Sequence, residues 1–261
     1  MKNESLIKNF IKNGYCKVKL YKKSEIDKIK KIIIKKLKSL DKKKFLKDLD
    51  LNNLHNYHLL NLNEEYHKNI LKTSTRYIKL NNHLNLLLKK FQILNLIMKK
   101  CWGHNNSILY WVGSLKKRNF KSNVVGFRIS RPNKIRKRDA TGVHIDLHVG
   151  GKICSDKNVL ISLWIPIIGF SPKYSLRIAP GSHLVDHPVK SFIKSKTVTN
   201  IFSENYTKKF KFVRPDLKIG EVIIFHPNLL HGNSLNKGNK SRLSLEARLY
   251  NKNNIKIWKQ V

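Results

Sequence analysis

Six short segments rich in β-branched and aromatic residues recur through the second half of the chain. They read SILYWVG, NVVGFRIS, GVHIDLHVG, NVLISLWIPI, EVIIFHP and RLSLEARLY, and all lie between residues 107 and 250. Turn-forming runs such as RPNK, FSPK, APGSH and NKGNK separate them. Many short strands divided by turns that contain glycine and proline are typical of a β-sandwich or barrel. We therefore predict a mainly β core over residues 106–261.

The first part of the chain, residues 1–105, has a mostly helical pattern instead. Between residues 24 and 40, apolar side chains recur at helical spacing, at Ile26, Ile29, Ile33, Leu37 and Leu40. A second helix is predicted over about 83–100, and the stretch from 41 to 80 is ambiguous. The 261 residues contain no linker or internal repeat and suffice for one large domain. We predict a single α+β domain, 1–261, with the N-terminal helices packed on the β core.

The formal net charge of +38 is the most unusual property of the composition. Such a charge suits an anionic substrate or partner, such as a phosphate, a nucleotide, a carboxylate or a nucleic acid. Lysine and asparagine also have A-rich codons, so an AT-rich genome would produce the same excess. The sequence leaves both explanations open.

The cysteines and the hydropathy of the chain indicate the cellular compartment in which the protein is expected. Cys16, Cys101 and Cys154 form no CxxC pair, and their odd number argues against a disulfide framework. The N-terminal segment is polar and lacks an apolar signal core. The longest apolar run, ILNLIM at 93–98, is too short to cross a bilayer. We therefore expect a cytoplasmic protein without a membrane span, of unspecified oligomeric state.

The segment GVHIDLHVGG, at 142–151, places polar side chains at every second position. In a strand His144, Asp146 and His148 would point to one face of the sheet. A non-haem Fe(II) site takes two imidazoles and one carboxylate and leaves positions open for a co-substrate and O2. His144 and Asp146 supply two of these ligands. The third ligand is predicted to be His231, 85 residues after Asp146, with His226 as the competing choice.

A candidate cation for binding a 2-oxoglutarate co-substrate lies a few residues after His231 in the sequence. Arg242 lies 11 residues after His231, and arginine binds a carboxylate through two parallel hydrogen bonds. Ser244 would share the strand face of Arg242 and could donate a hydrogen bond to the same carboxylate. Arg248, on the same strand, is expected to form a simple ion pair.

These motifs together resemble one family, the phytanoyl-CoA dioxygenase-like (PhyH) 2-oxoglutarate/Fe(II) oxygenases. The resemblance covers about residues 123–250 and rests on FRIS, HID, SLWIPI, RIAPGSH, IGEVIIFHPNLLHGNS and the RLS strand. It implies a double-stranded β-helix, the jelly roll of cupin-like proteins, with Fe(II) inside. By position, His144, Asp146 and His231 would be the catalytic iron ligands, and Arg242 would anchor 2-oxoglutarate.

Further residues are expected around this centre. Ser244 and Arg128 would join Arg242 in binding the co-substrate. The substrate-binding candidates are His148, Arg136, Arg138 and His183; both of these arginines belong to the basic run KIRKR, just before the metal-binding segment. Trp164 is predicted to lie in the core.

The predicted function is hydroxylation of a small, anionic metabolite, with release of succinate and CO2. One alternative is an AlkB-type nucleic-acid dealkylase, because two arginines six residues apart and a basic surface would suit phosphates. Another is a non-catalytic basic binding protein on a cupin-like scaffold. The spacing from His231 to Arg242 and the PGSH segment favour the small-molecule oxygenase.

Overall fold

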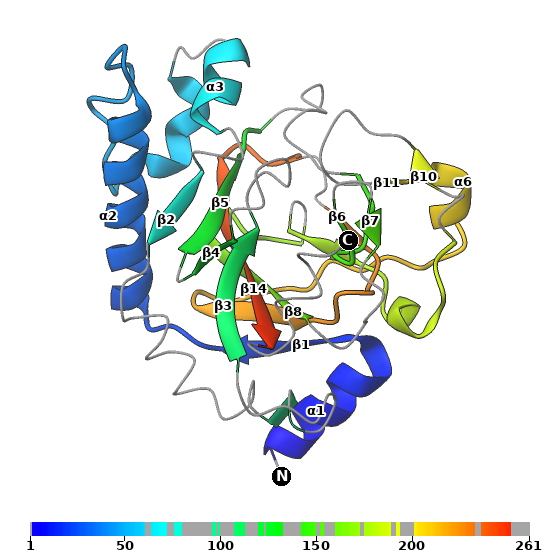
Figure 1. The fold of residues 1–261 in the computed structure, drawn as a ribbon. Coiled ribbons are helices and arrows are strands. Elements are labelled where there is room, and N and C mark those ends of the chain that lie inside the picture. The colour runs from blue at the N-terminus through cyan, green and yellow to red at the C-terminus, as the bar shows by residue number, and fades with distance from the viewer. Residues whose placement is uncertain are drawn as a thin grey trace.

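A computed structural model describes fifteen stretches of the chain. They are residues 2–60, 64–71, 76–79, 96–97, 99, 107–112, 120–122, 124–132, 142–149, 152–153, 160–172, 175–188, 192–193, 201–232 and 236–251, the last reaching into the final strand. Five of the predicted β segments are strands in this part of the chain. The structure therefore confirms a mainly β core with additional helices (Figure 1).

An eight-stranded antiparallel sheet is the larger layer of the fold. Its path runs in the order β1 (Tyr15–Lys19), β12 (Glu221–Phe225), β8 (Leu160–Ile168), β14 (Arg242–Asn251), β3 (Ser107–Val112) and β4 (Phe120–Ser122). β5 (Val124–Ser130) pairs with β14 and with β2 (Tyr77–Lys79). The N-terminal part, predicted to be mostly helical, thus contributes β1 and β2 to the sheet.

Shorter ladders form the second layer. β9 (Arg177–Ile178) pairs with β13 (His231–Gly232), and isolated bridges join His144 to His231 and Ile178 to Val213. β6 (His148–Val149) pairs with β7 (Lys152–Ile153), and β10 (Phe192–Ile193) pairs with β11 (Ile201–Phe202). Trp164 and Phe225 of the large sheet pack against Ile178 of β9. Two β layers around such an interior confirm the predicted jelly-roll class.

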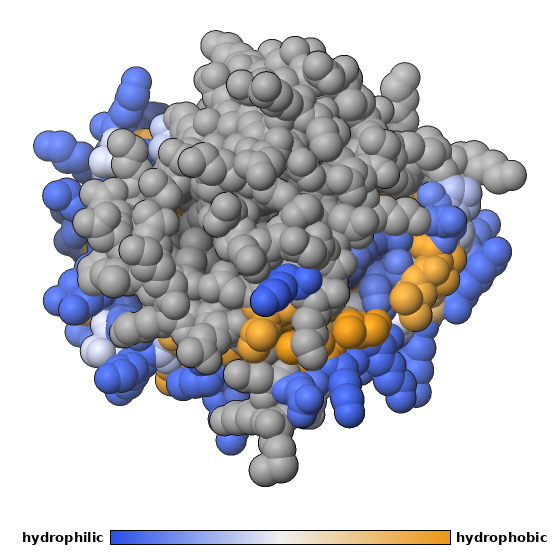
Figure 2. Space-filling view, turned by 60° about the horizontal axis from the view of Figure 1, so that its bottom comes forward, coloured by the Kyte–Doolittle hydropathy of each residue, from blue (hydrophilic) through white to orange (hydrophobic). Residues whose placement is uncertain are grey.

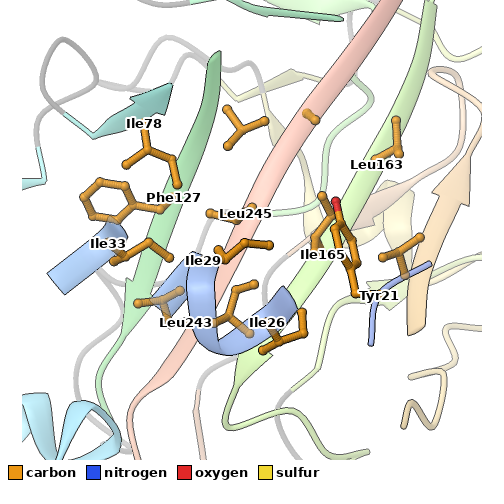
Figure 3. Close-up of a cluster of buried hydrophobic side chains, with 14 of the residues drawn as sticks. Tyr21, Ile26, Ile29, Ile33, Ile78, Phe127, Leu163, Ile165, Leu243 and Leu245 are labelled. Atoms are coloured by element: carbon orange, nitrogen blue, oxygen red, sulfur yellow. The ribbon is translucent and has the colours of Figure 1, made fainter. Parts of the chain in front are cut away.

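The predicted helix at 24–40 is α2 (Lys23–Leu40), which covers the outer face of the large sheet (Figure 1). Its Ile26, Ile29 and Ile33 join a buried cluster with Leu243 and Leu245 of β14 (Figure 3). Burial of each such side chain contributes about 1.5–3 kcal/mol before the entropic cost of folding. The lysines of α2 alternate with these residues and are mainly exposed, so they form a solvated face.

The other helical elements are short. They are α1 (Lys2–Asn13), η1 (Leu54–Leu59), α3 (Glu64–Ile70), η4 (Ser182–Leu184) and α6 (Glu204–Thr207). The predicted helix at 83–100 falls almost wholly outside the described residues. No helix in the described part of the chain is long and apolar enough to cross a membrane. Figure 2 shows that the described surface on one face is largely hydrophilic, with apolar side chains confined to smaller areas.

The two faces of β14 carry different side chains: one face contributes to the hydrophobic core, and the other faces the interior of the jelly roll. Leu243, Leu245 and Ala247 belong to the cluster beneath the helices. Arg242, Ser244, Glu246 and Arg248 therefore share the opposite face, because successive side chains in a strand point to opposite sides. This polar face looks toward the segment that carries His144 and Asp146.

Candidate metal centre

The segment around His144 is not the continuous strand that its alternation predicted. His144 forms a single β-bridge with His231, residues 146–147 form a turn, and only His148–Val149 are in a strand. The backbone N–H of Asp146 donates to the carbonyl oxygen of Pro227 at 2.8 Å. These contacts hold the segment against the chain that carries His231.

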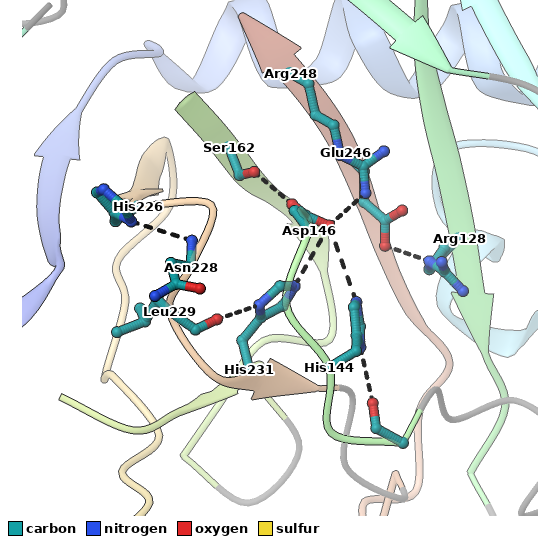
Figure 4. A network of polar contacts seen from close by, with 11 residues as sticks. Arg128, His144, Asp146, Ser162, His226, Asn228, Leu229, His231, Glu246 and Arg248 are labelled. Atoms are coloured by element: carbon teal, nitrogen blue, oxygen red, sulfur yellow. Dashed lines mark hydrogen bonds and ion pairs between the residues drawn. The ribbon is translucent and has the colours of Figure 1, made fainter. Parts of the chain in front are cut away.

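The three predicted ligands meet at one point inside the fold (Figure 4). Nε2 of His231 lies 3.8 Å, and Nε2 of His144 lies 4.0 Å, from Oδ1 of Asp146. One donor atom from each residue falls within 4.8 Å of the other two, and all three residues are buried. This spacing is compact enough to hold a single metal ion.

The hydrogen bonds of both imidazoles leave the metal-facing nitrogen available. Nδ1 of His144 lies 2.8 Å from the carbonyl oxygen of Gly142, and Nδ1 of His231 lies 2.9 Å from that of Leu229. A carbonyl only accepts, so each Nδ1 is the protonated donor and each Nε2 carries a lone pair. Burial lowers the pKa of His144 to about 3 and also lowers the pKa of His231. Both imidazoles are therefore neutral at neutral pH, as metal ligation requires.

The carboxylate of Asp146 is held from both sides. The hydroxyl of Ser162 donates to Oδ2, and Nη2 of Arg248 lies 2.5 Å from Oδ1. Burial alone would raise the pKa of Asp146, but Arg248 and the two histidines outweigh burial and hold it well below its usual range. Arg248 forms the ion pair predicted for it, and its partner is the candidate metal ligand. Two imidazoles and an ionised carboxylate on one face fit Fe(II).

Gly232 explains why a small residue follows His231. A Cβ at this position would lie 2.9 Å from the carbonyl oxygen of Gly142 and 3.2 Å from Cα of Val143. The same Gly142 carbonyl accepts the hydrogen bond from His144. The close approach therefore lets the two ligand-bearing segments lie side by side.

Arg248→Met should destabilise the metal-free protein, because it leaves the Asp146 carboxylate buried without its cation. Breaking a buried ion pair costs about 3–5 kcal/mol. Since the folded-state pKa of Asp146 is depressed, the pair stabilises the fold at neutral pH, and its contribution is lost as the pH falls through that pKa. Chemical denaturation at neutral pH measures the loss, and added Fe(II) should recover part of it.

The exposed Arg214 supplies the matched control for this variant. Arg214→Met removes the same charge from the surface and should change the free energy of unfolding by less than about 0.5 kcal/mol. Equal stability of Arg248→Met and the unchanged protein would show that the ion pair with Asp146 is unimportant.

The predicted co-substrate residues lie deeper in the jelly roll. The guanidinium of Arg242 is fully buried, donates to Oγ of Ser130 at 2.7 Å and lies 5.9 Å from the ring of Trp164. Oγ of Ser244 and Nε1 of Trp164 are buried, and neither has a hydrogen-bond partner in the part of the chain that the structure describes. A cation with two orphaned donors beside it fits the distal carboxylate of 2-oxoglutarate. Trp164 lies in the core as predicted, and its indole N–H adds a donor that the sequence reasoning missed.

Arg128 lies in the wall of the metal pocket. A pocket of about 30 Å³ contains the three ligands, and its lining includes apolar side chains together with Arg128, Glu246 and Arg248. Arg128 forms an ion pair with Glu246, whose pKa falls to about 2 because the nearby arginines outweigh its burial. Glu246 and Ser162 were not singled out from the sequence. The alternation R-x-S-x-E-x-R along β14 is the signal that would have found Glu246.

Of the remaining predicted residues, the structure describes the side chains of His183 and His226, and neither is a member of the triad. His183 contacts the end of α1 through the carbonyl oxygen of Ile11, 3.0 Å from its Nε2, and its ring lies 5.2 Å from that of His226. His226 accepts a hydrogen bond from the backbone of Asn228, so it is not the third ligand in this geometry. Arg136, Arg138 and the side chain of His148 lie outside the described residues.

Several solved structures share this fold. SnoK, a non-heme alpha ketoglutarate dependent carbocyclase from nogalamycin biosynthesis, is 12% identical with a TM-score of 0.56, over 95% of this chain and 83% of that one. The epimerase SnoN, solved with Fe3+ and alpha ketoglutarate, is 14% identical with a TM-score of 0.55, over 96% and 84%. EctD from S. alaskensis, solved with 2-oxoglutarate and 5-hydroxyectoine, is 15% identical with a TM-score of 0.54, over 95% and 76%. At such identities the likeness establishes the fold alone.

The sequence itself carries the assignment to a family. No curated protein matches it. The model of the family "Phytanoyl-CoA dioxygenase (PhyH)", in contrast, matches residues 10–244, which is most of the chain. The predicted resemblance is therefore confirmed, and the chain belongs to the phytanoyl-CoA dioxygenase family of 2-oxoglutarate- and iron-dependent oxygenases.

Proposed function

We propose that this oxygenase hydroxylates a small anionic metabolite in the cytoplasm, with release of succinate and CO2. Fe(II), 2-oxoglutarate and O2 are the cofactor and co-substrates. The observation that carries the proposal is the buried His144, Asp146 and His231 cluster, with cationic side chains on one wall of its pocket. Membership of the family supports the oxygenase class, and the arginines of the wall support an anionic substrate.

The proposed roles of the residues follow from their contacts. When bound, the iron together with 2-oxoglutarate and O2 supplies the oxidising power that inserts an oxygen atom into a C–H bond. His144, Asp146 and His231 would hold the metal from one side and leave the opposite side open. Arg242, Ser244 and Trp164 would bind the distal carboxylate of the co-substrate. The apolar wall, which includes Leu163, Leu176 and Phe225, would exclude water from the reacting atoms.

Succinate release in the presence of candidate substrates tests this function. The protein loaded with Fe(II) and 2-oxoglutarate is exposed to O2 with phosphorylated, nucleotide-linked or carboxylated metabolites, and with their neutral analogues. An anionic metabolite should stimulate succinate release, and its KM should rise with salt because screening weakens attraction to the cationic wall. The product should be one oxygen atom heavier than the substrate.

Three outcomes would contradict parts of this proposal. Stimulation only by neutral compounds would remove the electrostatic argument. Stimulation by methylated single-stranded DNA or RNA would favour the dealkylase alternative, to which the +38 charge and the arginines at 242 and 248 also point. A product without added oxygen would indicate another reaction of this oxygenase class, such as epimerisation or ring closure.

A further inference from the structure

A second cavity is lined by residues of α3 and β5 and shares Arg128 with the metal pocket. Its volume is about 160 Å³, several times that of the pocket at the triad. Part of its lining is apolar, from Leu71, Phe127 and Ile129. Arg128 lines both cavities, so a molecule that occupies one of them reaches the wall of the other.

The polar side chains of this cavity are mostly basic. Arg76, Arg128, Lys68 and His67 line it, with Glu64 as its carboxylate among the described residues. Glu64 forms an ion pair with the buried guanidinium of Arg131, at 3.0 Å. Its negative charge is therefore already balanced by an arginine outside the cavity lining.

Backbone pairing places Arg76 opposite Phe127, the residue that precedes Arg128. The carbonyl oxygen of Arg76 accepts a hydrogen bond from the backbone N–H of Phe127, at 3.0 Å, directly before β2 begins. Arg76 is partly buried. Burial lowers its pKa to about 9, and the positive charge of Arg128 acts in the same direction. The guanidinium therefore still carries its charge at neutral pH.

Among the described residues, the arginines around Glu246 outnumber the carboxylates that they contact. Arg76, Arg128 and Arg248 all act electrostatically on the single carboxylate of Glu246. Arg248 is shared with Asp146, and that carboxylate is the candidate metal ligand. Two guanidinium groups that line one cavity are a typical site for a carboxylate or phosphate, which arginine binds through paired hydrogen bonds.

We propose that the cavity between α3 and β5 binds the anionic group of the substrate, a carboxylate or a phosphate, through Arg76 and Arg128. Because Arg128 also borders the metal pocket, a substrate anchored in this way presents its adjoining carbon atoms to the triad. The inference rests on the proposed function, since it identifies the substrate's binding group for that same centre. It also assigns a binding role to part of the positive charge, which a codon bias alone would not explain.

Binding of inorganic phosphate and of acetate tests this assignment. Calorimetric titration is performed without O2 on the protein loaded with Fe(II) and 2-oxoglutarate, at constant ionic strength. At least one of the two anions should bind the unchanged protein at a single site. Arg76→Gln should weaken this binding by at least about tenfold, since it removes one charge-assisted contact. Arg76→Lys should retain part of the affinity.

Lys35→Gln is the matched control, because it removes one positive charge from the exposed face of α2 and should leave anion binding unchanged. A preference for phosphate over acetate assigns a phosphorylated substrate, and the reverse assigns a carboxylated one. Equal affinity in Arg76→Gln and the unchanged protein, or no measurable binding of either anion, would overturn the subsite.

The visible charge-transfer absorption of the ferrous 2-oxoglutarate complex separates failure of the subsite from failure of the proposed function. It should form in the unchanged protein and in every variant of Arg76. If the absorption forms but the substitution of Arg76 does not change phosphate or acetate binding, the subsite alone is wrong. Where it does not form even in the unchanged protein, the proposed function is wrong.

Discussion

Replacing either His144 or His231 with alanine will abolish the binding of one Fe(II) per chain. Each variant removes one of three donor atoms that lie within 4.8 Å of one another in a buried cluster. The remaining imidazole and carboxylate cannot hold the ion tightly, because the described part of the chain brings three protein ligands to the site. Anaerobic titration of the metal-free protein with Fe(II) measures the stoichiometry, which should be one for the unchanged protein.

His226→Ala is the control that makes this result specific. His226 is five residues from His231, but its Nδ1 accepts a hydrogen bond from the backbone N–H of Asn228, at 3.1 Å. Iron binding should therefore be retained in this variant. Full iron binding by His144→Ala or His231→Ala would contradict the assignment, and loss of iron in His226→Ala alone would transfer the third position to His226.

Those features of the fold that depend on local pattern could be predicted from the sequence. The apolar repeat that includes Ile26, Ile29 and Ile33 predicts α2, because helical spacing creates the face that packs on the sheet. The alternation in RLSLEARLY predicts β14. In a strand its leucines are buried on one face of the sheet, and its polar side chains lie on the opposite face. Such signals need no knowledge of distant partners.

The segment around Asp146 shows where alternation misleads. GVHIDLHVG has the period of a strand, yet residues 146–147 form a turn. The turn is fixed by contacts with residues more than eighty positions away, His231 and Pro227. A period-two pattern indicates that successive side chains face opposite sides. A turn that lies between two other segments can show the same pattern as a strand.

The candidate site was predictable in its ligands and not in its surroundings. His144, Asp146, His231 and Arg242 carry a recognisable spacing. The ion pair between Arg248 and Asp146 joins residues 102 positions apart, and the approach of Arg76 to Arg128 depends on the pairing of β2 with β5. Short β1 and β2, with lysine in both, carry too little apolar signal for either pairing to be anticipated.

Arg242→Leu should weaken 2-oxoglutarate binding at least about tenfold while Fe(II) binding is retained. In the structure Arg242 is fully buried on the inner face of β14, next to the orphaned donors Ser244 Oγ and Trp164 Nε1. Leucine keeps an apolar side chain at this position but removes the charge-assisted contact to the distal carboxylate, about 1.5–3 kcal/mol. Each 1.4 kcal/mol or so corresponds to a tenfold change in the dissociation constant. Anaerobic titration of the iron-loaded protein with 2-oxoglutarate, followed by its charge-transfer absorption, measures the change.

Two companion variants separate anchoring from general disturbance of the core. Arg242→Lys keeps the charge and loses the planar pair of donors, so its affinity should lie between those of the leucine variant and the unchanged protein. Ser244→Ala removes one neutral donor and should weaken binding by less than Arg242→Leu, by a factor of about two to ten. Retained Fe(II) binding in all three variants shows that the fold and the triad are intact. If Arg242→Leu binds 2-oxoglutarate normally and Arg128→Gln does not, the anchoring cation is Arg128 and not Arg242.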